Sequence, residues 1–86
     1  MNIQEQIDTN LKDWIFENNQ IRKTYQFDNF VKAINFVNLV ASLAEKANHH
    51  PDIFIQYSKV SITLSTHDAG EVTQKDIALA SEIDSH

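Results

Sequence analysis

The strongest constraint on the fold of this chain is a long helical pattern that stands between two pairs of strand-like segments. From Asn29 to about Ala47, apolar residues recur at the three- and four-residue spacing of an α-helix. On either side, residues 20–27 and 53–65 alternate apolar and polar side chains, which is typical of half-buried β-strands. A chain of 86 residues can bury a single modest core. The sequence therefore predicts one domain over residues 1–86.

The first pair of predicted strands is joined by a tight turn. Residues 14–16 form the first strand, and Asn18-Asn19 supplies side chains that tolerate a positive φ. Lys23 interrupts the apolar side of the second strand, so we expect an edge of the sheet near it. Asp28 is the predicted N-cap of the long helix.

The second half of the chain repeats this arrangement. Residues 53–57 and 60–65 form two further strands, with Ser58-Lys59 near their junction, and residues 68–70 end the last strand. Thr73 caps a final helix, because Asp76 follows it at the spacing of a capping box. With a short amphipathic helix over residues 2–12, the order is α-β-β-α-β-β-α. This order predicts an α+β fold in which a four-stranded antiparallel sheet carries helices packed on one face.

The apolar face of the long helix is wider than packing against one sheet requires. Either a second element of the chain or a partner subunit must cover the excess, and we expect a partner subunit to supply part of the cover. The apolar arc comprises Phe30, Ala33, Ile34, Phe36, Val37, Leu39, Val40, Ala41, Leu43 and Ala44.

Charge and composition exclude several classes of protein. The net charge is −5 and the seven basic residues form no patch, so we expect no direct binding to nucleic acid. The absence of cysteine excludes disulfides and thiolate metal sites. No apolar run approaches the length of a membrane span, and the start of the chain lacks the apolar core of a signal peptide. The sequence predicts a cytoplasmic protein that does not bind membranes.

Three of the four histidines lie on predicted loops next to the ends of regular elements. His49 and His50 precede Pro51, and His67 follows a returning strand. Because imidazole changes its charge near neutral pH, these residues together favour a site that transfers protons. Taken alone, adjacent histidines on a polar loop are more often exposed to solvent. Three imidazoles can also hold zinc, but neighbouring residues rarely both bind one ion.

The segments around these histidines closely resemble the pterin-4a-carbinolamine dehydratase family. The resemblance covers about residues 14–83 and includes the His-His-Pro, Thr-His and Asp-x-x-Leu-Ala combination in this order. The matching segments are Ala44–Asp52, Tyr57–Val60, Thr66–Gly70 and Thr73–Ala80.

The resemblance implies an activity and a set of site residues. Members of the family dehydrate 4a-hydroxytetrahydrobiopterin to a quinonoid dihydropterin, without a metal or a cofactor, as homodimers or homotetramers. This chain would then bind a small-molecule pterin. The family pattern assigns catalysis to His49, His50 and His67, substrate contacts to these three with Pro51, Thr66, Asp68 and Ala69, and supporting roles to Glu45 and Asp76.

One residue of this chain departs from the pattern of the family. Many members have two glycines before the last helix, whereas here Glu71 follows Gly70. If the second position needs a left-handed backbone, Glu71 carries strain of about 1 kcal/mol.

Two alternative functions stay open. The first alternative is a regulatory or interaction module, like the family members that stabilise a transcription-factor dimer. The second is a related enzyme that acts on a molybdopterin intermediate.

Overall fold

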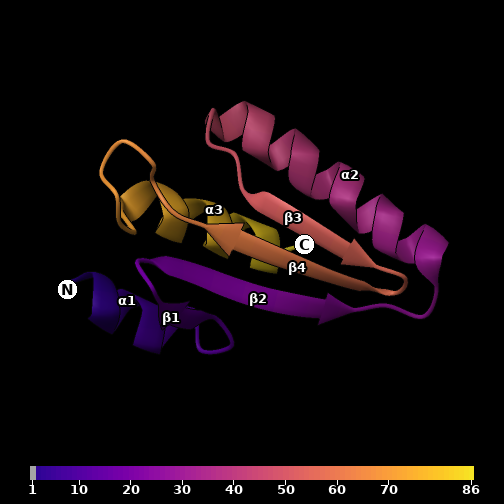
Figure 1. Cartoon of the computed structure of the whole chain (residues 1–86), viewed down its shortest axis with the longest axis horizontal. Helices are drawn as coiled ribbons and strands as arrows, with labels where there is room; N and C mark the ends of the chain where they lie inside the picture. The colour runs from indigo at the N-terminus through magenta and orange to yellow at the C-terminus, as the bar shows by residue number, and fades with distance from the viewer. Residues whose placement is uncertain (1) are drawn as a thin grey trace.

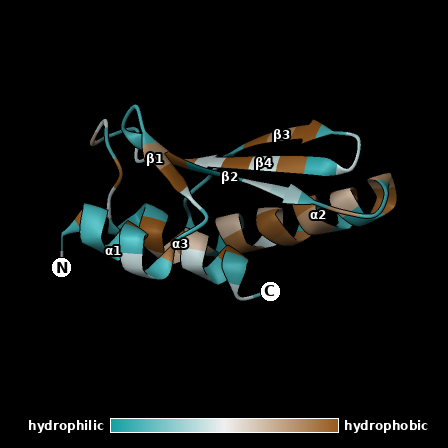
Figure 2. Cartoon of the chain, turned by 90° about the horizontal axis from the view of Figure 1, so that it is seen from below, coloured by the Kyte–Doolittle hydropathy of each residue, from teal (hydrophilic) through white to brown (hydrophobic). Residues whose placement is uncertain are grey.

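An antiparallel sheet forms one layer of the molecule and the helices form the other (Figure 1), with all the helices on the same face of the sheet (Figure 2). This confirms the predicted α+β fold and its order of elements. The computed structural model describes residues 2–86. The elements are α1 Ile3–Asn10, β1 Ile15–Glu17, β2 Gln20–Gln26, α2 Phe30–Ala47, β3 Asp52–Gln56, β4 Lys59–Leu64 and α3 Gln74–Asp84.

The sheet has the strand order β1-β2-β4-β3, so the two central strands come from different hairpins. Ile21 lies opposite Leu64 on β4, and both side chains are buried against the helices. Strand β1 pairs with β2 only as far as Arg22. Beyond it, β2 forms the margin of the described sheet, which confirms the edge expected near Lys23.

The two hairpin turns differ in how well the sequence predicted them. Asn18 and Asn19 both have positive φ, as expected for a two-residue turn. In the second hairpin the turn begins at Tyr57, which has a φ of 54° and a 69% exposed side chain. The strand predicted over residues 53–57 therefore ends at Gln56, one residue earlier than expected, and Tyr57 belongs to the turn.

The N-cap of α2 lies one residue later than predicted. Asn29 accepts a hydrogen bond from the Lys32 backbone N–H at 2.9 Å, so Asn29 is the N-cap rather than Asp28. The Asp28 carboxylate instead pairs with the ammonium group of Lys32 at 3.1 Å. Both side chains can cap a helix, and the residue with extended backbone at the helix start takes the role.

The wide apolar arc of α2 is covered in part by α3. Val40 and Ala44 are fully buried, and Phe36, Val37 and Leu43 pack against the core. A second element of the same chain thus supplies cover that the sequence had led us to expect partly from a partner subunit. Phe30 remains 50% exposed at the start of the helix.

The carboxylate of Asp84 fastens the C-terminal end of α3 to the first half of the chain. It accepts hydrogen bonds from Trp14 Nε1 at 2.9 Å, Lys23 Nζ at 2.9 Å and Tyr25 Oη at 2.6 Å. Burial raises the pKa of Asp84, but the hydrogen bonds from Tyr25, Lys23 and Trp14 outweigh it and lower the pKa below its ordinary value. Burial and the bond to Asp84 raise the pKa of the Tyr25 hydroxyl, which therefore stays a donor.

We expect Asp84→Asn to lower the free energy of unfolding by about 1–2 kcal/mol at pH 7, because bonds to a charged acceptor are lost. The folded pKa of Asp84 lies below the unfolded one, so this stabilisation is present at neutral pH and lost as the pH falls below about 4. Urea unfolding of both proteins at several pH values measures the difference. Glu82→Gln, on the same helix, is the control. If the stability difference between the two proteins stayed constant from neutral to acid pH, the stabilising role given to the Asp84 carboxylate would be wrong.

Candidate active site

The segments that carry the predicted site residues meet at one end of the molecule. The C-terminal end of α2, the loop that follows it and the loop between β4 and α3 lie together there (Figure 1). They line an open, polar cavity of about 450 Å³. Its lining consists of Asn48, His49, His50, Pro51, Asp52, Thr66, His67, Asp68 and Lys75.

The end of α2 fixes the backbone of His49. Asn48 adopts a left-handed conformation with a φ of 52°, which ends the helix. The His49 backbone N–H then donates to the carbonyl of Ala44 at 3.1 Å, and that of Asn48 donates to Glu45 at 3.1 Å. These two bonds satisfy carbonyls that a helix end otherwise leaves unpaired. The end of α2 therefore fixes the backbone of His49, the first catalytic candidate.

A tight turn fixes the second loop. The backbone N–H of Thr66 donates to Glu71 at 3.0 Å, and Thr66 in turn accepts from Gly70 at 2.9 Å. Gly70 takes a left-handed backbone with a φ of 67°, whereas Glu71 does not. The strain considered for Glu71 is therefore absent, because Gly70 alone meets the need for a positive φ.

Asp76 joins both loops to the start of α3. Its side chain is 0% exposed, and Oδ2 accepts from the Thr66 hydroxyl at 2.8 Å and from the Thr73 backbone N–H at 2.9 Å. The second contact completes the predicted capping box. Oδ1 lies 2.5 Å from His49 Nε2.

The contact with Asp76 determines which nitrogen of His49 is available. A carboxylate only accepts hydrogen bonds, so Nε2 of His49 must carry a proton and donate it to Asp76. This leaves Nδ1 as the nitrogen that can accept or release a proton. His49 is largely buried, with 12% of its side chain exposed, and it lines the cavity. The arrangement gives a fixed, oriented imidazole suited to proton transfer.

The other two histidines are held less tightly. His50 is exposed and its Nε2 bonds the carboxylate of Glu45, one turn back on α2. His67 is exposed on the opposite loop, and the structure gives its ring no hydrogen-bond partner within residues 2–86. Ala69 lies on the turn after Thr66 and is not among the described residues that line the cavity.

Three lining residues were not singled out from the sequence. Asn48 and Asp52 flank the histidine pair, and Lys75 lies in the first turn of α3. Asn48 carried a usable signal, because asparagine is common where a helix ends in a left-handed residue. Lys75 carried none, since its approach to the cavity depends on how α3 docks against α2.

Neither a metal cluster nor a membrane helix is found in the described part of the chain. Within residues 2–86, no group of three or more His, Cys, Asp or Glu side chains is placed to hold a metal ion. No helix among these residues is long and apolar enough to cross a membrane.

Comparison with known proteins identifies the family. The family model described as "Pterin 4 alpha carbinolamine dehydratase" matches residues 1–86. The chain belongs to the pterin-4-alpha-carbinolamine dehydratase family. A relative in Chloroflexus aurantiacus is 57% identical over 72 residues, which cover 84% of this chain and 77% of the relative. A relative in Gloeobacter violaceus is 49% identical over 86 aligned residues, which cover 92% and 94%. Both carry the family name provisionally.

Solved structures of pterin dehydratase relatives share this fold. A transcriptional coactivator/pterin dehydratase from Brucella melitensis superposes with a TM-score of 0.84 at 30% identity, over 99% of this chain and 95% of that one. A pterin dehydratase-like protein described as a RuBisCO assembly factor in the alpha-carboxysome gives a TM-score of 0.69 at 22% identity, over 84% and 83%. The second likeness concerns the fold alone.

We expect Asp76→Asn to lower the free energy of unfolding by about 2 kcal/mol, because an amide cannot accept from all three partners of a buried carboxylate. Thermal or urea unfolding measures the loss. Asp68→Asn, on the exposed part of the same site, is the control and should leave the stability unchanged. Equal stability of the two variants would show that Asp76 does not hold the loops together.

Proposed function

We propose that this protein dehydrates 4a-hydroxytetrahydrobiopterin to the quinonoid dihydropterin and water, by acid/base catalysis from histidine. The observation that carries the proposal is the buried Asp76–His49 pair, which opens on the histidine cavity of a member of the pterin dehydratase family. Membership supports the reaction class, and the pair supplies a group with the required chemistry.

The reaction needs two proton transfers on neighbouring atoms. The bond between carbon 4a and its hydroxyl oxygen breaks as that oxygen gains a proton and leaves as water. The adjacent ring nitrogen loses its proton, and its electrons form the new carbon–nitrogen double bond. Groups that titrate near neutral pH can serve as acid and as base, and each positioned transfer typically contributes about 10²- to 10⁴-fold.

His49 and His67 take these two transfers in the proposal. Nδ1 of His49 is available because Nε2 is bound to Asp76, so Asp76 acts as the supporting residue. His67 lines the same cavity from the opposite loop, and its ring has no hydrogen-bond partner within residues 2–86. His50, supported by Glu45, helps to bind and orient the pterin.

The remaining predicted residues complete the substrate site. Pro51, Thr66 and Asp68 line the cavity, and Ala69 lies on the adjoining turn, where the family pattern puts substrate contacts. No cofactor or metal enters the proposed reaction. Location in the cytoplasm remains a prediction from the sequence.

We expect His49→Ala and His67→Ala each to slow dehydration by about 10²-fold or more, because one positioned proton transfer is removed. The rate of 4a-hydroxytetrahydropterin decay, followed by ultraviolet absorbance, measures the effect. His86→Ala, at the exposed end of the chain, is the control. Full activity in both His49→Ala and His67→Ala, with the fold intact, would exclude the histidine mechanism.

A second proposed role is interaction between subunits. Part of the apolar arc on α2, including Phe30, stays exposed to solvent. This exposed part supports assembly as a homodimer or homotetramer, and also the alternative of a regulatory module. A molybdopterin-linked enzyme would need the same histidines, so a screen of purified pterins separates that alternative from the dehydratase.

We expect Leu39→Glu to reduce the mass of the protein in solution to that of a monomer, because a charge on the apolar arc opposes burial between subunits. Light scattering after gel filtration measures the mass. Asn38→Glu, on the adjacent exposed position of α2, is the control. An unchanged mass in Leu39→Glu would remove the support for this interface.

A further inference from the structure

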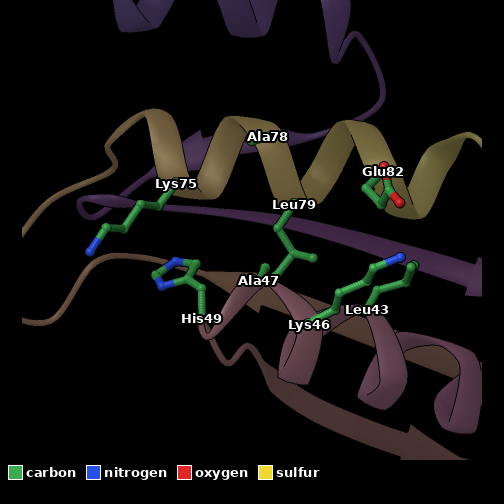
Figure 3. Close-up of a pocket in the computed structure, with 8 residues that line it drawn as sticks. All are labelled: Leu43, Lys46, Ala47, His49, Lys75, Ala78, Leu79 and Glu82. Carbon is green, nitrogen blue, oxygen red and sulfur yellow. The ribbon is translucent and has the colours of Figure 1, made fainter.

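A second cavity adjoins the candidate active site, in the groove between α2 and α3. It has a volume of about 330 Å³ and is mainly apolar. The proposed reaction makes no use of it. Its walls are Leu43, Lys46 and Ala47 on α2 and Lys75, Ala78, Leu79 and Glu82 on α3, with His49 beside them (Figure 3).

The groove exists because small side chains stand where the two helices approach each other. On each helix the wall residues follow the i, i+3, i+4 spacing of one helical face, so each set forms one stripe. Ala47 and Ala78 are exposed and leave the space open, whereas the buried Leu79 and half-buried Leu43 provide apolar surface. A longer side chain at either alanine would occupy this space.

The groove and the histidine cavity are neighbours that share part of their walls. His49 and Lys75 line both of them. In Figure 3 these two residues lie at one end of the groove, and Lys46 and Glu82 lie at the other. Along α3, Lys75 and Glu82 are about 10 Å apart at the helical rise of 1.5 Å per residue. A ligand that contacts His49 can therefore extend a side chain along the groove.

The far end of the groove offers one donor and one acceptor. The structure gives the side chains of Lys46 and Glu82 no hydrogen-bond or ion-pair partner among residues 2–86. Ammonium donates and carboxylate accepts, so hydroxyl groups can bond to both. A carboxylate or phosphate would meet the like charge of Glu82, and a plain hydrocarbon would engage neither residue.

We propose that the α2–α3 groove is the subsite for the substituent at carbon 6 of the pterin, and that it selects a short carbon chain with hydroxyl groups. The inference rests on the proposed function, because that function places the pterin ring in the histidine cavity. The apolar wall takes the carbon chain, while Lys46 and Glu82 bond its hydroxyls.

The test compares two substrates that differ only at carbon 6, one with a methyl group and one with a dihydroxypropyl chain. We expect the wild-type protein to show a KM about tenfold lower for the dihydroxypropyl substrate, the effect of one or two hydrogen bonds. Ala78→Leu fills the groove and should abolish this preference, with little change in the KM for the methyl substrate. Lys46→Met, which removes the donor without filling space, should reduce the preference.

Ser81→Leu is the matched control, because it adds the same kind of side chain to an exposed position of α3 outside the groove. It should keep the wild-type preference. Fluorescence titration with the oxidised forms of the same two pterins provides a second readout that does not depend on catalysis.

The outcomes separate this inference from the proposed function. Equal acceleration of both substrates, unaffected by Ala78→Leu, would overturn the groove subsite and leave the dehydratase standing. Binding of both pterins without acceleration would overturn the dehydratase, and the ratio of the two affinities would then decide the subsite. Failure to bind either pterin would overturn both.

Discussion

The buried carboxylate of Asp76 is the interaction on which the rest of this end of the molecule depends. An ionised acid in a protein interior is costly unless donors replace the lost water. Here the donors come from three segments: the loop after α2 through His49, the loop after β4 through Thr66, and the start of α3 through Thr73. Because all three must arrive for the charge to be tolerated, the carboxylate fixes their relative positions. The polar cavity is a result of that geometry.

Helix α3 carries a carboxylate near each end, and the helix dipole acts on the two in opposite ways. Asp76 lies in the first turn, where the helix dipole favours a negative charge. Asp84 ends the same helix, where the dipole disfavours one. The donors Trp14, Lys23 and Tyr25 offset this at Asp84. The two acids thus attach opposite ends of α3 to different parts of the chain.

The sequence predicted those features that depend on local patterns. Alternation gave the strands, and the spacing of Thr73 and Asp76 gave the capping box, because both patterns act between near neighbours in the chain. The alternation could not show that Tyr57 leaves the strand for the turn.

These local patterns could not predict the features that depend on how distant segments dock. No local spacing encodes the placement of α3 beside α2. This placement brings Lys75 to the histidine cavity and puts Ala47 and Ala78 on the two walls of one groove. The contact of Asp76 with His49 has the same origin, although the family resemblance pointed to both residues.

The attachment of α3 through residues far apart in the chain has a consequence for the order of folding. His49 and Asp76 are separated by 27 positions, and Trp14 and Asp84 by 70. Contacts of such long range form only after the intervening chain has been closed into a loop. The hairpins and α2 leave the ribosome before α3 does. During synthesis, therefore, the imidazole of His49 has no buried carboxylate to orient it until the last helix has emerged and docked.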